Sequence, residues 1–167
     1  CAFVHFQQAG VQAAVIEVGL GGRLDATNLV EPEVCVITPV SLDHMPKLGS
    51  TLGQIAGEKA GILKRGVPAV IAPQAAEALQ VIKETARLRG TGLHRVDREV
   101  RIEMEEIGLS GSVATFQTPR ESYPSLRVPL LGRHQLMNAA VAIRAIELFF
   151  ENGNIGTGYP QGTRYHG

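Results

Sequence analysis

The sequence lacks the features that mark several classes of protein. Only two cysteines, Cys1 and Cys35, occur among its 167 residues, too few for a disulfide framework. Cys35 lies inside an apolar run, which favours a reducing, cytoplasmic compartment. Sixteen basic residues balance sixteen acidic ones, so no excess charge points to nucleic acid or a membrane surface as a partner. The longest apolar runs fall far short of the roughly 20 residues that cross a bilayer, and no signal-peptide pattern is present.

What is present fits a globular domain. The chain is 44% hydrophobic and 19% charged, and its mass of 17.9 kDa suits one compact domain. It begins with Cys1 rather than Met, so we expect an internal piece of a longer protein. Residues 1–150 are expected to form one partial domain. Residues 151–167, with five glycines and no periodicity, are expected to be a linker or a ragged end.

Apolar runs and helical patterns alternate along the first half of the chain. This alternation predicts an α/β fold, with a mostly parallel sheet and helices on both of its faces. The expected strands are 11–18, 33–38 and 67–72, and the expected helices are 1–10 (the end of one), 50–64 and 74–89. Polar alternation then predicts a small antiparallel portion, and a long helix follows. Its strands are expected at 100–107, 112–117 and 126–130, and the helix at 134–150.

Polar residues follow the predicted strands at their carboxyl ends, where open α/β sheets place ligands. Glu17 ends the first run and is followed by a glycine-rich turn, while His44 follows the second run in an Asp-His pair. With Lys59 on the next helix, these side chains are expected on one rim of the sheet. Each also has a plain structural interpretation, as an exposed turn carboxylate, a loop contact or part of a solvated helix face.

Lys59 raises a chemical question if this rim holds a metal ion, because an ammonium repels a cation. Reaction with CO2 would convert the amine into a carbamate, whose oxygens suit magnesium. Further along, the helix start at 131–138 offers polar side chains to an anion or a nucleotide, although ordinary capping is the alternative. Tyr123 and the mixed-charge stretch 95–106 have no evident partners and are expected at the surface.

Two phosphate-binding motifs are absent or incomplete. A dinucleotide fingerprint would need a third glycine where Leu24 stands and a helix starting nearby. The oxidoreductase alternative is therefore poorly supported. No Gly-Lys-Ser/Thr sequence of a P-loop occurs in the chain.

Four stretches occur in an order and spacing that closely resemble the folylpolyglutamate synthase family. This family includes bifunctional dihydrofolate synthases and lies within the Mur ligase superfamily. The stretches are EVGLGGRLDATN (17–28), LDH (42–44), LGSTLGQIAGEKAGILK (48–64) and LLGRHQLMNAAVA (130–142). The resemblance implies that residues 1–150 form part of a Mur ligase central, P-loop NTPase-like domain, with the P-loop upstream of Cys1.

The resemblance also implies roles for individual residues. Glu17 and His44 correspond to magnesium ligands, and Lys59 corresponds to the lysine that becomes carbamylated; His44 and Lys59 are the expected catalytic residues. Substrate and cofactor contacts carry over in the same way: Leu24, Asp25 and Ala26 to the folate or pterin site, and Asn138 to ATP.

The implied reaction is an ATP-dependent ligation. ATP activates the carboxylate of a folate or dihydropteroate as an acyl phosphate, and the amino group of L-glutamate attacks it, giving an amide, ADP and phosphate. Small molecules are then the only partners, with no nucleic acid or membrane, and the full-length protein is expected to be a cytoplasmic monomer. Two alternatives stay open, a cell-wall precursor ligase of the same superfamily and a non-catalytic α/β scaffold. The 167-residue chain by itself is expected to bind ATP weakly and to be inactive.

Overall fold

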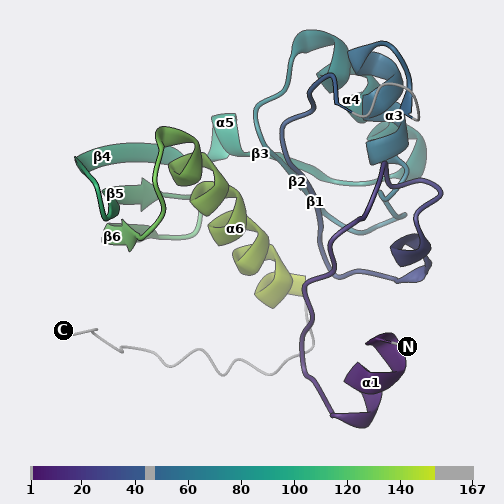
Figure 1. The fold of residues 1–167 in the computed structure, drawn as a ribbon, viewed down its shortest axis with the longest axis horizontal. Helices are drawn as coiled ribbons and strands as arrows, with labels where there is room; N and C mark the ends of the chain where they lie inside the picture. The colour runs from purple at the N-terminus through teal and green to yellow at the C-terminus, as the bar shows by residue number, and fades with distance from the viewer. Residues whose placement is uncertain (1, 44–47, 153–167) are drawn as a thin grey trace.

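Two three-stranded sheets and the long helix α6 (Arg133–Asn152) organise the chain. The computed structural model describes residues 2–43 and 48–152. In Figure 1 the antiparallel sheet lies to the left of α6 and the parallel sheet to its right. Apolar residues of α6 pack against both sheets and join them through one buried cluster.

The parallel sheet has the order β1-β2-β3, as the alternating pattern predicts. Its strands are β1 (Cys35–Ile37), β2 (Ala69–Ile71) and β3 (Leu93–Arg95). The central strand β2 is buried on both faces, because Ala69 and Ile71 belong to one apolar cluster and Val70 to the other. One cluster contains α3 and α4 and the other contains α6, which confirms the prediction of helices on both faces.

Two helices cover one face of this sheet, α3 (Leu52–Ala60) and α4 (Ala76–Arg89). The side chain of Thr51 accepts a hydrogen bond from the Gln54 N–H and caps α3 at its start. Gly90 ends α4 in the left-handed conformation, with φ of 63°. Both helices therefore begin or end where local residue chemistry places a boundary.

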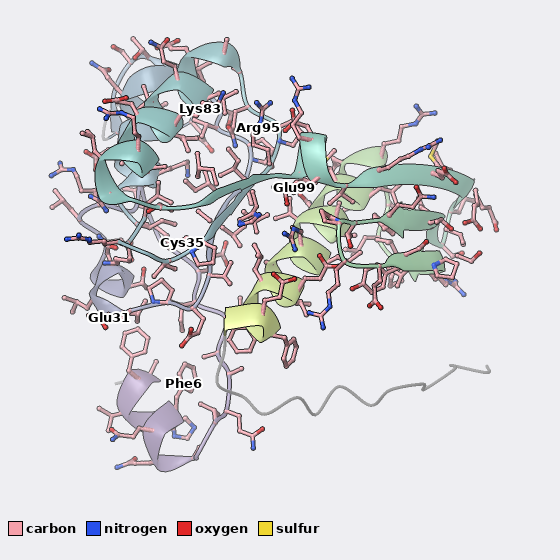
Figure 2. All side chains as sticks on the ribbon, turned by 180° about the vertical axis from the view of Figure 1, so that it is seen from behind. Phe6, Glu31, Cys35, Lys83, Arg95 and Glu99 are labelled. Carbon is pink, nitrogen blue, oxygen red and sulfur yellow. The ribbon has the colours of Figure 1, made fainter. Side chains whose placement is uncertain are left out.

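Cys35, the first residue of β1, is buried against the segment that follows α3, and its side chain points into the interior (Figure 2). Its thiol donates a hydrogen bond of 3.4 Å to the carbonyl of Ile62. Burial raises the pKa of this thiol, against smaller opposing effects of Lys64 and Arg89. Among the described residues it is a free cysteine.

The second sheet is antiparallel with the order β4-β5-β6. Its strands are β4 (Arg101–Gly108), β5 (Gly111–Gln117) and β6 (Ser122–Val128). Ala114 and Phe116 of β5 are fully buried in the cluster that contains α6. The strand predicted at 126–130 begins earlier in the structure, at Ser122, so Pro124 lies inside β6. Proline is tolerated there because β6 is an edge strand.

The prediction of a buried strand at 11–18 was wrong. This run has no strand structure, and Val15 is fully exposed. A strand needs neighbours for its backbone hydrogen bonds, and within the described residues β1 pairs only with β2. The run therefore forms no described pairing with β1, although β1 is an edge strand of this sheet.

The remaining elements are short. The expected helix end at 1–10 is α1 (Ala2–Gln8), and the glycine-rich turn contains the 3-10 helix η1 (Ala26–Leu29). Two short elements, β3 and α5 (Val96–Glu99), have no counterpart among the elements predicted from the sequence. The long helix begins one residue earlier than expected and continues to Asn152, two residues into the expected linker; residues 153–167 lie outside the described part. No helix in the described ranges has the length and hydrophobicity to span a bilayer.

Candidate functional site

A cavity of about 180 Å³ lies beyond the carboxyl end of β1. Its walls come from three segments that are distant in the sequence. The glycine-rich turn contributes the stretch 18–21, the segment after β1 contributes Ser41 and Asp43, and α3 contributes Ile55 and Lys59. A site at this edge of the sheet matches the position that the α/β pattern predicts.

Of the three residues expected to share a metal ion, the structure places Lys59 in the cavity wall. Glu17 is exposed, and its neighbour Val18 lines the cavity. His44 lies outside the described residues, and its neighbour Asp43 also lines the cavity. In the described ranges no three His, Cys, Asp or Glu side chains come together around a common point. The convergence of Glu17, His44 and Lys59 on one ion therefore stays a prediction.

Asp25 braces the glycine-rich turn. One carboxylate oxygen accepts hydrogen bonds from the N–H groups of Gly19 and Leu20, each at 3.1 Å. The other accepts from the Thr27 hydroxyl at 2.6 Å and from the Thr27 N–H at 2.9 Å. These donors, the Thr27 hydroxyl first, lower the pKa of Asp25 to about 2. Its neighbours Leu24 and Ala26 are exposed at the tip of the turn.

The brace predicts a measurable pH dependence. The pKa of Asp25 is lowered from 3.8 to about 2, so its contribution to stability is complete above pH 3.8 and is lost as the pH falls through about 2. In an NMR titration, the amide shifts of Gly19 and Leu20 are expected to follow a midpoint near pH 2. The Asp25→Asn variant should lose this step. A midpoint near 3.8 in the unsubstituted chain would contradict the brace.

The same turn is docked on the last turn of α3. The Arg23 N–H donates to the carbonyl of Glu58 at 2.9 Å, and the Arg23 side chain pairs with the Glu58 carboxylate at 2.9 Å. The Asn28 amide donates to the carbonyl of Gly61 at 3.3 Å. Lys64 reaches back to the carbonyl of Asn28 at 2.8 Å. Glu58 is therefore an interaction partner of the turn.

Close backbone approach makes this docking possible. Gly22 has φ of 149°, and a Cβ atom there would lie 3.0 Å from the carbonyl oxygen of Glu58. A Cβ atom on Gly61 would lie 2.6 Å from the Arg23 Cα. Glycine at both positions lets the turn lie directly on the helix end.

Asn138 lies apart from this cavity in the first turns of α6. Its side chain is exposed, and its amide donates to the Gln135 side chain at 3.1 Å. It does not line the cavity. The structure therefore leaves the predicted ATP contact untested.

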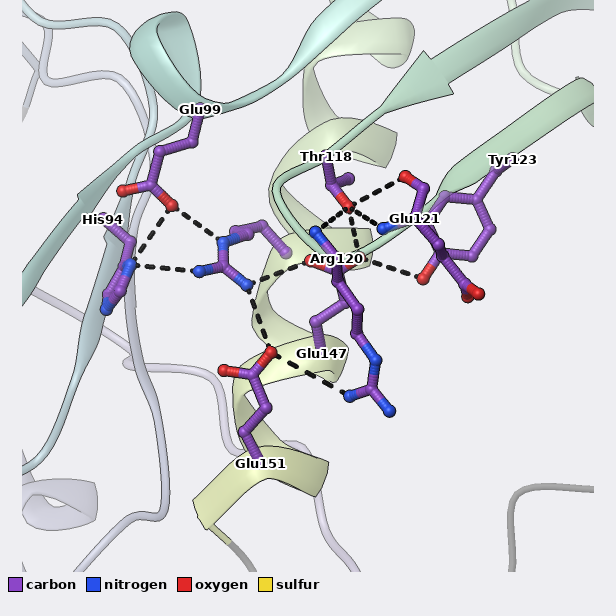
Figure 3. A network of polar contacts seen from close by, with 9 residues as sticks. His94, Glu99, Thr118, Arg120, Glu121, Tyr123, Glu147 and Glu151 are labelled. Carbon is purple, nitrogen blue, oxygen red and sulfur yellow. Dashed lines mark hydrogen bonds and ion pairs between the residues drawn. The ribbon is translucent and has the colours of Figure 1, made fainter.

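A second group of polar side chains forms a network away from the cavity, where α6 meets both sheets (Figure 3). Arg144 donates to Glu99 at 2.8 Å and to Glu147 at 3.0 Å, and its Nη2 lies 3.3 Å from the His94 ring. Tyr123 donates to the Glu147 carboxylate at 3.0 Å. Burial, with Glu147 nearby, raises the pKa of Tyr123 well above its usual range, so the phenol stays a donor. The expectation that Tyr123 has no partner and lies at the surface was wrong. In the stretch 95–106 most residues are exposed, as expected, but Val96 is buried and Glu99 belongs to this network.

The sequence did contain one sign of this network. Glu147 interrupts the apolar face of the predicted helix, and Arg144 stands three residues before it, a spacing that places the two side chains side by side. Burial alone lowers the pKa of Arg144, but the hydrogen bonds to Glu99 and Glu147 outweigh it and raise that pKa. The partners of Arg144 on β3 and α5 carry no comparable sign in their own sequence.

Comparison with known proteins gives consistent matches. Residues 2–146 match the model of the Mur ligase middle domain. The chain is 43% identical over 148 residues to the dihydrofolate synthase/folylpolyglutamate synthase of Bacillus subtilis, covering 88% of this chain and 34% of that protein. The chain thus spans about a third of the length of that curated relative.

Solved structures show the same fold. An FPGS–AMPPCP–folate complex is similar with a TM-score of 0.87 and 37% identity, over 90% of this chain and 37% of that one. The Mycobacterium tuberculosis folylpolyglutamate synthase complexed with ADP and AMPPCP gives a TM-score of 0.84 and 39% identity, over 90% of this chain and 35% of that one.

Proposed function

The chain belongs to the Mur ligase middle domain family, and on that premise we propose that it forms the central part of an ATP-dependent ligase joining L-glutamate to a folate or dihydropteroate carboxylate. The observation that carries the proposal is the 43% identity to a dihydrofolate synthase/folylpolyglutamate synthase over 88% of the chain. A solved FPGS complex with AMPPCP and folate, similar over 90% of this chain, supports the choice of substrates.

The reaction needs activation because joining a carboxylate to an amine in water is uphill. Transfer of the γ-phosphoryl group of ATP to a carboxylate oxygen gives an acyl phosphate and ADP. The glutamate nitrogen then attacks the carbonyl carbon, phosphate leaves with the bonding electrons, and the nitrogen loses a proton. The chain's contribution is to hold these groups in position and to stabilise the charge that develops.

Lys59 is the residue of the cavity with the clearest proposed role. Its uncharged amine would react with CO2 to give a carbamate and a proton. That carbamate, with Glu17 and His44, would hold Mg²⁺. The oxygens of Ser41 and Asp43 in the same wall suit such an ion, whereas an unmodified ammonium would repel it. A bound magnesium ion supplies neutralisation of the phosphate charge.

Two other segments complete the proposal. Leu24 is 79% exposed at the tip of the braced turn, and we assign it with Asp25 and Ala26 to the pterin or folate contact. Asn138 is assigned to ATP. Because its side chain is exposed in the first turns of α6, it is accessible to a ligand there.

The test is ATP-dependent incorporation of radiolabelled glutamate into dihydropteroate or tetrahydrofolate. The longer protein expected from the sequence should catalyse it, and the 167-residue chain should not. Lys59→Ala should lower the rate by about 100-fold or more. Lys83→Ala, which replaces an exposed lysine on α4, serves as the control and should leave the rate unchanged. Amino-acid addition to a nucleotide-linked peptide, without addition to either pterin substrate, would overturn the proposal.

A further inference from the structure

Glu58 and Lys59 are adjacent on α3, and they belong to different environments. Lys59 lines the cavity. Glu58 contacts Arg23, and a single oxygen of its carboxylate lies 2.9 Å from both Nε and Nη2 of that arginine. The Glu58 side chain is 25% exposed and the Arg23 side chain is 53% exposed. A pair this exposed adds little to stability, so its importance lies in what it joins.

The pair joins the last turn of α3 to the middle of the glycine-rich turn. Carbonyl groups at a helix end have no partners within the helix. Here the turn adds donors to two of them. The Arg23 N–H meets the Glu58 carbonyl, which also accepts from the Gly61 N–H, and the Asn28 amide meets the Gly61 carbonyl, which also accepts from Arg89. The turn and the helix end therefore share one set of hydrogen bonds.

The other end of the turn forms a cavity wall. Gly19, Leu20 and Gly21 line the cavity together with Lys59. Asp25 ties Gly19 and Leu20 to the part of the turn that follows Arg23. A continuous series of contacts thus runs from Glu58 through Arg23 and Asp25 to the wall that shares the cavity with Lys59.

We propose that Glu58 is a positioning residue: its pair with Arg23 holds the turn 19–28 on the end of α3 and so sets the space between Lys59 and the Gly19–Gly21 wall. The role of this space in catalysis rests on the proposed function. The coupling itself is a property of the chain and can be measured without turnover.

The experiment compares Glu58→Gln with Glu84→Gln in the 167-residue chain. Glu84 makes the same kind of pair with Arg87, at 2.6 Å, on the exposed side of α4. Mass spectrometry would record amide hydrogen exchange over residues 19–28 and the acylation rate of Lys59, with exposed Lys83 as the internal reference.

Glu58→Gln is expected to raise both the exchange and the Lys59 acylation rate by about two- to fivefold, the change that matches an exposed ion pair. Lys83 should not change, and Glu84→Gln should leave all three readouts as they are. Arg23→Lys, which keeps the charge, should retain part of the protection that the unsubstituted chain shows. Equal behaviour of Glu58→Gln and Glu84→Gln would overturn the proposal.

The two proposals can fail separately. Loss of protection in Glu58→Gln, together with absence of glutamate ligation by the longer protein, would support the coupling and overturn the proposed function. Glutamate ligation by the longer protein, together with unchanged exchange of the turn in Glu58→Gln, would support the proposed function and overturn the coupling.

Discussion

Replacement of Arg144 by methionine is expected to lower the free energy of unfolding by about 3–5 kcal/mol. The Arg144 side chain is 7% exposed and its partner Glu147 is 1% exposed. Without the guanidinium, the Glu147 carboxylate would be buried next to Thr118 and Tyr123 with only hydroxyl donors. An uncompensated buried charge is far more costly than a lost surface contact. Urea unfolding of the chain, followed by circular dichroism, measures the change.

Arg87→Met is the matched control. Arg87 pairs with Glu84 three residues away, as Arg144 does with Glu147, but the side chains of Arg87 and Glu84 are both more than half exposed. Its replacement should change the unfolding free energy by less than about 1 kcal/mol. If Arg144→Met lowered the free energy of unfolding by no more than Arg87→Met does, the stabilising role of the buried network would be contradicted. Replacing Arg144 and Glu147 together by apolar residues should recover part of the loss.

Gly61→Ala is expected to destabilise the chain by about 1–3 kcal/mol, the usual cost of overpacking. Local rules predict the opposite. Gly61 follows α3 with helical angles, φ of −59° and ψ of −18°, where alanine is favoured over glycine. The added methyl group, however, would lie 2.6 Å from the Arg23 Cα. The turn must therefore move away from α3.

Gly57→Ala provides the comparison on the same helix. A Cβ atom at Gly57 meets only Val81, at an ordinary 3.8 Å. This variant should be more stable by about 0.5–1 kcal/mol. Thermal unfolding of both variants gives the two signs directly. Equal shifts in the same direction would show that the turn does not constrain Gly61.

The sequence predicted those elements whose signals are local. The periodic helix predicted at 74–89, found at 76–89, and the apolar run around β2 are examples, because their boundaries depend on nearby residues. The stretch 11–18 has the same apolar pattern as β2. However, β2 lies between β1 and β3, whereas 11–18 is paired with no described strand, and the apolar pattern alone does not bury a segment. β3 was missed because an edge strand of three half-buried residues, Leu93–Arg95, has no alternation to detect.

The candidate site shows the same division. Lys59 was identified from the family resemblance, and the structure places it in a cavity wall. The partnership of Glu58 with Arg23 spans 35 positions, and no local pattern announces it. Arg144 and Glu147 gave a partial signal through their spacing. Their remaining partners come from other elements, which only the tertiary fold brings together.

The position of Cys35 gives the chain an internal reporter. Its sulfur is covered by the segment after α3 and its pKa is raised, so an alkylating reagent can reach it only after β1 and that segment separate. With Cys1 replaced by serine, the labelling rate of the single remaining thiol would count transient openings of this layer. The frequency of such openings could then be compared among variants under native conditions, without denaturant.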